Sequence, residues 1–101
     1  MASRLELQTK LEELLGSRNV YYQPPESLKM EYPAIRYSKS DIESRHADDI
    51  KYSNFTLYEI TVIDRKPDNS VIDKILFLPL SSFDRHYVAD NLNHDVIKLY
   101  F

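Results

Sequence analysis

The chain has 101 residues, 43% of them hydrophobic and 29% charged, which is the composition of one ordinary globular domain. Its net charge of −3 leaves no excess of Lys and Arg to replace phosphate counterions, so the charge argues against non-specific binding to nucleic acid. The absence of cysteine excludes disulfides, thiolate metal sites and cysteine catalysis, and we expect packing alone to hold the fold.

The first sixteen residues predict an amphipathic helix over residues 3–15. Ser3 and Glu6 have the spacing of a capping box, and Gly16 ends the apolar repeat. That repeat consists of leucines at helical intervals, namely Leu7, Leu11, Leu14 and Leu15. Because this segment carries charges throughout, and no later run approaches the ~20 apolar residues of a membrane span, we expect a soluble intracellular protein without a signal peptide.

Two short strands should follow, at residues 20–22 and 34–38, with Pro24 and Pro25 ending the first because proline cannot donate to a ladder. The charged stretch from Lys39 to Lys51 has neither the helical nor the strand period, and it is interpreted as an exposed loop. We hypothesise that this loop becomes ordered only on assembly with a partner.

Residues 54–64, "NFTLYEITVID", are the strongest strand in the sequence, rich in β-branched and aromatic residues. Neither of its faces is properly polar, so we expect this strand to be central in the sheet and covered on both sides. Two short helices can cover only one side, and a second subunit is the candidate cover for the other. A second helix is predicted over residues 70–77, after the turn and cap residues "RKPDNS" and before Pro79.

The last segment, "FDRHYVADNLNHDVIKLYF" at 83–101, predicts a β-hairpin with residues 91–93 as a three-residue loop. The predicted pairs are Asp90–His94, Ala89–Asp95, Val88–Val96, Tyr87–Ile97, His86–Lys98, Arg85–Leu99, Asp84–Tyr100 and Phe83–Phe101. This register sends the aromatic and aliphatic residues, Phe83 and Phe101 included, toward the core. The whole chain is therefore predicted to be an α+β domain: a mostly antiparallel mixed sheet of about five strands, an N-terminal helix, a second short helix and a C-terminal hairpin.

The same segment holds two histidines and three acids, which raises the alternative of a metal site. In the predicted register His86, Asp84, Asp90 and His94 share a face, but only Asp90 and His94 are close neighbours, and a closed zinc site needs more ligands. No phosphate-binding loop, nucleophile elbow or dinucleotide fingerprint is present in the sequence. We therefore predict no catalytic residues, no metal and no cofactor. Eight tyrosines, a residue type enriched at interfaces, indicate a binding protein, although strand formation alone could also account for them.

Three stretches, "VYYQPPESLKMEYPAIRYS", "YEITVIDRKPD" and "FDRHYVADNLNHDVIKLYF", resemble the small tail-terminator proteins of tailed phages and prophages of Gram-positive bacteria. The resemblance extends from Val20 to Phe101. It is most specific at residues 83–87 and 91–95. These family members are also called tail-completion or tail-to-head joining proteins.

The resemblance implies an α+β subunit of a homo-oligomeric ring, usually of six copies, at the head-proximal end of the virion tail. Such a ring caps the tube made by the major tail tube protein, stops tube polymerisation and offers a surface to the head connector or stopper protein. DNA passes through it without specific binding, and no membrane is involved. The residues expected to make the contacts are Tyr37, Asp41, Glu43, Arg45, Asp48, Asp49, Tyr58, Asp84, His86 and Tyr100.

Two alternatives stay open. A head-completion or stopper protein of the same connector region would share the size, the acidic charge and the absence of catalytic motifs. A small metal-dependent enzyme would instead use His86, Asp90 and His94.

Overall fold

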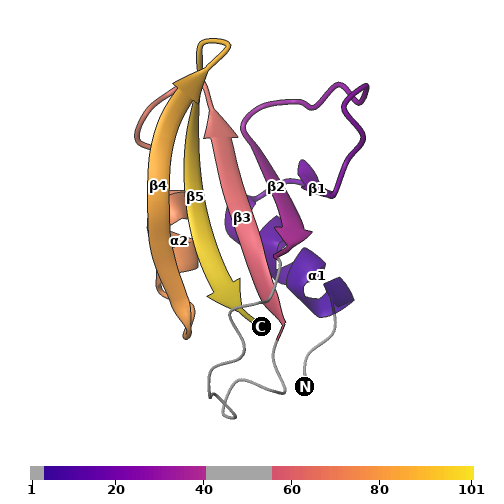
Figure 1. Cartoon of the computed structure of the whole chain (residues 1–101), viewed down its shortest axis with the longest axis vertical. Coiled ribbons are helices and arrows are strands. Elements are labelled where there is room, and N and C mark those ends of the chain that lie inside the picture. Colours follow the sequence, from indigo (N-terminus) through magenta and orange to yellow (C-terminus); the bar gives the residue numbers. More distant parts are fainter. Residues whose placement is uncertain (1–3, 41–55) are drawn as a thin grey trace.

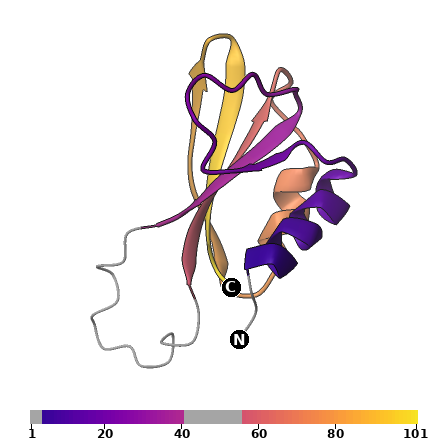
Figure 2. The same cartoon turned by 90° about the vertical axis from the view of Figure 1, so that its right-hand side faces the viewer.

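The computed structural model describes residues 4–40 and 56–101 of the chain. In these residues two helices and five strands follow one another as α1 (Arg4–Leu15), β1 (Val20–Tyr22), β2 (Ala34–Lys39), β3 (Leu57–Asp64), α2 (Val71–Leu76), β4 (Ser81–Ala89) and β5 (Leu92–Tyr100). The strands form one sheet in the order β1-β2-β3-β5-β4, in which only β1 and β2 run parallel. Both helices lie on one face of this sheet (Figures 1 and 2). The predicted α+β fold with a C-terminal hairpin is therefore confirmed.

The predicted elements agree with the observed ones to within about one residue at most ends. The helices begin and end within a residue of the predicted 3–15 and 70–77, and β2 runs one residue beyond the predicted 34–38, to Lys39. The β3 strand begins at Leu57, and residues 54–55 of the predicted strand lie outside the described residues. Residues 41–51 of the predicted loop also lie outside the described residues. The hypothesis that this loop becomes ordered on assembly therefore concerns residues that the structure does not describe.

The central strand β3 is buried on both faces, as predicted. Every second residue, Tyr58, Ile60 and Val62, points toward the helices and belongs to the main core cluster. The remaining core residues on this side come from α1, α2 and the neighbouring strands, namely Leu7, Leu11, Val20, Ile35, Tyr37, Val71, Ile75, Ile97 and Leu99. Burying such aliphatic side chains is the main force that holds the helices to the sheet.

The alternate residues of β3 point to the opposite face, on which none of the described helices lies (Figure 2). We call this side of the sheet the open face. By the strand registers it carries Tyr21, Ala34, Arg36, Ser38, Leu57, Glu59, Thr61, Ile63, Ser82, Arg85, Tyr87, Ala89, Leu92, His94, Val96, Lys98 and Tyr100. Thr61, Ile63 and Val96 are buried at the middle of this face, whereas Arg36, Glu59 and Lys98 are partly exposed and Arg85 is exposed.

The start of α2 shows how the turn before it is fixed. The Asn69 side-chain oxygen accepts a hydrogen bond from the backbone N–H of Val71 at 2.8 Å, and its amide donates to the Asp64 carboxylate at 2.7 Å. Asn69 thus satisfies a free helix N–H and ties the turn back to the end of β3. No helix among residues 4–40 and 56–101 has both the length and the apolar character needed to cross a membrane.

Replacing Ile60 by alanine tests the central position of β3. Ile60 is fully buried in the core cluster to which both helices contribute, so we expect Ile60→Ala to lower the free energy of unfolding by about 2–5 kcal/mol. Phe77→Ala is the matched control, because Phe77 is 88% exposed and should cost little. Chemical denaturation of the two variants gives the comparison, and equal losses would contradict the observed core.

Two core tyrosines lead us to expect that the protein loses stability at alkaline pH. Burial raises the pKa of Tyr37 and of Tyr58 above the usual value of 10.0, and Arg4, which donates to the Tyr37 hydroxyl at 3.2 Å, offsets part of the effect on Tyr37. The folded state therefore favours the neutral phenols. Their contribution to the free energy of unfolding is complete below about pH 10, and it decreases as the pH rises through the raised folded-state pKa values. Denaturation measured on both sides of this pH should show the loss, and the Tyr37→Phe, Tyr58→Phe double variant should show less of it.

Candidate interaction surface

The register of the C-terminal hairpin differs from the prediction by three residues near the turn. Val88 pairs with Asn93 instead of Val96, and Tyr87 pairs with His94 instead of Ile97. The turn consists of Asp90 and Asn91 alone, with φ values of 54° and 62°. Both values are in the left-handed region, as in the two-residue turns whose twist matches that of a hairpin. The prediction placed Asn91, Leu92 and Asn93 in the loop, and it missed that Asp-Asn can form such a turn.

A second irregularity lies in β4 itself. The ladder shifts between Phe83 and Arg85, so Asp84 is an extra residue in a β-bulge. With this bulge Phe83 lies opposite Ile97, on the helix side of the sheet but near its edge, where it is 48% exposed. The prediction that Phe83 pairs with Phe101 inside the core is therefore wrong.

Phe101 does extend the sheet, but its backbone pairs with Thr56 instead of Phe83. Its backbone N–H donates to Thr56 at 3.0 Å, and its carbonyl accepts from the Thr56 N–H at 3.2 Å. Its side chain is partly buried against the main core. Phe101 is thus part of the β3–β5 pairing, and its expected place in the core sheet is confirmed.

The two histidines of the hairpin lie on opposite faces of the sheet. His86 donates from Nδ1 to the Asp95 carboxylate at 2.7 Å on the helix side. His94 lies on the open face, donates from Nδ1 to the Leu92 carbonyl at 3.1 Å and stacks on the Tyr87 ring with centroids 4.6 Å apart. The predicted arrangement, with both histidines on one face beside Asp90, is wrong because it depended on the wrong register.

This geometry does not supply a set of metal ligands. His86 and His94 cannot bind one ion together, since the sheet separates their rings. In the part of the chain that the structure describes, no three His, Asp or Glu side chains form a group that could hold a metal. Nor does any buried polar side-chain atom of those residues lack a hydrogen-bond partner.

The open face carries a small excess of positive charge. Arg36, Arg85 and Lys98 lie on it with Glu59, and Asp84 at the bulge adds a second carboxylate beside Arg85. Arg85 is 3.9 Å from the Glu59 carboxylate and also contacts Asp84 at the bulge, 2.5 Å away. Arg36 and Lys98 form no ion pair with any residue that the structure describes. The three cations and Glu59 were not among the predicted contacts, although the alternation of "AIRYSK" and "LYEITVID" could have placed Arg36 and Glu59 on one face.

The residues predicted as contacts are dispersed. Tyr37 and Tyr58 are only 1% and 5% exposed and are parts of the core, so a partner can reach little of either. Asp84 and His86 are exposed on β4, and Tyr100 is half-buried on the open face. The other five predicted contacts, Asp41, Glu43, Arg45, Asp48 and Asp49, lie outside the described residues. The surface therefore retains the predicted hairpin residues and adds the charged residues of the open face.

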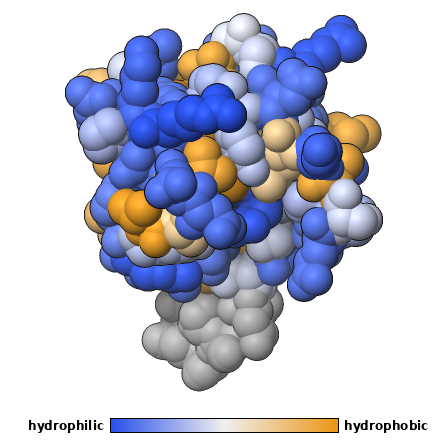
Figure 3. Space-filling view, turned by 90° about the horizontal axis from the view of Figure 1, so that it is seen from above, coloured by the Kyte–Doolittle hydropathy of each residue, from blue (hydrophilic) through white to orange (hydrophobic). Residues whose placement is uncertain are grey.

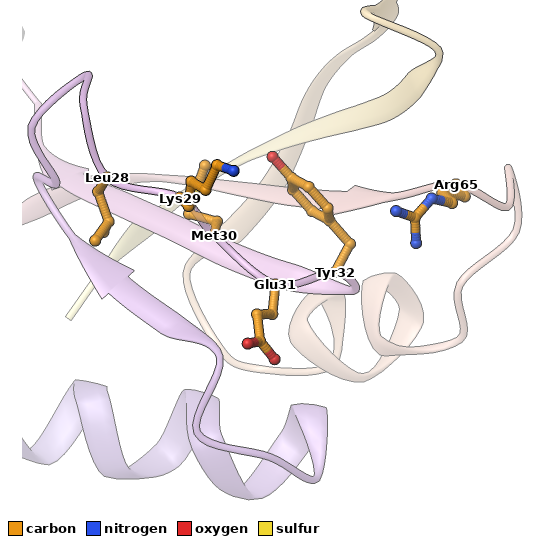
Figure 4. Close-up of a pocket in the computed structure, with 6 residues that line it drawn as sticks. All are labelled: Leu28, Lys29, Met30, Glu31, Tyr32 and Arg65. Atoms are coloured by element: carbon orange, nitrogen blue, oxygen red, sulfur yellow. The ribbon is translucent and has the colours of Figure 1, made fainter.

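A shallow groove of about 580 Å³ lies between the β1–β2 loop and the end of β3. It is lined by Leu28, Lys29, Met30, Glu31, Tyr32 and Arg65. In Figure 4 the Arg65 guanidinium points toward the Tyr32 ring, 5.9 Å from its centroid, while Glu31 points to the other side of the loop. Among its lining residues the groove has two cations, Lys29 and Arg65, and one acid, Glu31.

The exposed apolar side chains form separate areas on the surface, but most of them come from one segment of the sequence, near β4. Seen from above, the surface is mostly hydrophilic with separate apolar areas (Figure 3). Of the six large apolar residues exposed in residues 4–40 and 56–101, four come from the α2–β4 segment: Phe77, Leu80, Phe83 and Val88. Since β4 is also a sheet edge, this segment and the open face form the accessible surface with the strongest signs of contact with another protein.

Comparison with known proteins gave no relatives. No known family's sequence model matches the chain, and no curated protein and no solved structure is significantly similar to it.

Replacing Asn91 tests the two-residue turn. A β-branched residue is strained at a φ of 62°, so Asn91→Val should lower the free energy of unfolding by about 1–2 kcal/mol. Asn91→Gly is the control and should leave stability nearly unchanged, because glycine adopts this conformation readily. Thermal or chemical unfolding measures both, and a harmless Asn91→Val would indicate a turn at other residues.

Proposed function

We propose that this chain is a phage tail terminator, a subunit that forms a ring on the tail tube, ends tube polymerisation and prepares the tail for joining to the head. The observation that carries the proposal is the resemblance of the segment 83–101, which is most specific at residues 83–87 and 91–95. The fold supports it, since an α+β domain with helices packed on a mixed sheet is what the resemblance implies.

The surface chemistry also supports a structural role. The described residues offer an edge strand and exposed apolar side chains near it, which are features of proteins that bind other proteins. The hairpin histidines are occupied by Asp95 and by the Tyr87 ring on opposite faces, so the geometry gives no support to the alternative of a metal-dependent enzyme. The net charge of −3 suits a ring through which DNA must slide without being held.

The test is the effect of the purified protein on growing tail tubes. Tubes polymerised from the tube protein encoded in the same genome should stop lengthening when the protein is added, and it should remain bound to one tube end. Length distributions from electron micrographs provide the measurement, with heat-denatured protein as the control. Binding to tail-less heads, with no effect on tube length, would instead identify a stopper protein, and binding to neither would reject both connector roles.

A further inference from the structure

The groove beside the β1–β2 loop is built at the end of the sheet where β2 begins and β3 ends. Strand pairing places Ala34 opposite Ile63, so the same register continued by two residues places Tyr32 opposite Arg65. Tyr32 is half-buried and Arg65 is exposed. In Figure 4 the Tyr32 ring lies between the Arg65 guanidinium and the Lys29 amine. Two cations thus flank one aromatic ring in the groove.

Hydrogen bonds hold both walls of the groove in place. On the loop side, the Glu31 backbone N–H donates to the Tyr21 hydroxyl at 3.3 Å. On the opposite side, the Asn93 side-chain amide donates to the Arg65 carbonyl at 3.1 Å and so ties this residue to β5. A site whose walls are already positioned loses less conformational freedom when a ligand binds.

The cations of the groove are available to an acidic ligand. Neither Lys29 nor Arg65 forms an ion pair with any residue that the structure describes. Glu31, the one acid among the lining residues, points to the other side of the loop (Figure 4). The Arg65 guanidinium lies 5.9 Å from the centroid of the Tyr32 ring. An arginine held by a ring in this way can still donate two parallel hydrogen bonds to a carboxylate.

The shape and the apolar lining of the groove favour a segment of protein as its ligand. Leu28, which is 41% exposed, and Met30 add an apolar wall on which an apolar side chain can pack. The volume of about 580 Å³ is in the range of ligand sites, but small-molecule sites bury most of the ligand's surface and this groove is shallow. An extended chain that enters at one end and leaves at the other fits such a shape.

We propose that this groove binds an extended acidic segment of a partner protein, in which carboxylates alternate with apolar side chains. One carboxylate binds the Arg65 guanidinium, a second lies near the Lys29 ammonium, and the apolar side chain packs on the wall formed by Leu28 and Met30. A nucleic-acid strand fits less well, because it carries a phosphate at every nucleotide and only two cations line the groove. The proposal is independent of the proposed function.

A titration followed by nuclear magnetic resonance tests the proposal. The isotope-labelled full chain is titrated with a peptide in which aspartate and leucine alternate, and with two matched peptides that carry lysine or serine in place of aspartate. We expect saturable shifts of the backbone signals of residues 28–32 and of Arg65 with the aspartate peptide alone. Binding should weaken as the salt concentration rises, because salt screens exposed charges.

Two double variants separate the groove from the general charge of the protein. Lys29→Gln with Arg65→Gln removes both cations and should weaken binding about tenfold or more, since each such charge pair contributes about three- to fivefold. Lys10→Gln with Lys66→Gln is the matched control, because it removes two exposed positive charges outside the groove and should leave binding unchanged. The dispersion of the amide signals reports whether each variant is folded.

Three results would overturn the proposal: no saturable shift up to about 1 mM aspartate peptide, binding of the lysine or serine peptide that is equally tight, or an equal loss in the control variant. Saturable shifts of the same residues with single-stranded oligothymidylate, and none with the aspartate peptide, would assign the groove to nucleic acid instead. The two proposals fail separately, because this titration uses no tail tubes. Peptide binding without capping of tubes would reject the terminator function alone, whereas capping without peptide binding would reject the groove site alone.

Discussion

The burial of β3 on both of its faces is the constraint on which the rest of the structure depends. Side chains of a strand alternate between faces, so Ile60 and Val62 hold the helical layer while Thr61 and Ile63 are buried on the other side. As the third of five strands, β3 also pairs with both β2 and β5. Through the pairing of the strands, the alternation of β3 therefore fixes which residues of the other four strands face the helices and which form the open face.

That division gives the protein two unlike surfaces. One surface is a helical layer with one more acid than base, and the other is a sheet face on which Arg36, Arg85 and Lys98 lie beside Glu59 and the bulge carboxylate of Asp84. Two unlike surfaces are consistent with a subunit that works in a ring.

The sequence was sufficient for the elements because each has a strong local signal: the leucine repeat of α1, the β-branched run of β3 and the prolines near the strand and helix ends. The hairpin register was not predictable in the same way. Its pairing depends on the two-residue turn at Asp90 and Asn91 and on the bulge at Asp84, and both set the register by backbone conformation rather than by apolar pattern. An apolar pattern alone favoured burying Phe83, which is half-exposed at the sheet edge.

The interaction surface was predicted in part for the same reason. Asp84, His86 and Tyr100 could be identified from the hairpin segment itself. The basic residues of the open face, in contrast, come from the three strands β2, β4 and β5 and lie on one face only through the sheet order. An electron cryomicroscopy reconstruction of the protein on the end of a tail tube tests the central claim most directly. We predict a closed ring of copies at the tube end. A tube end without such a ring, or with a single copy, would contradict the account.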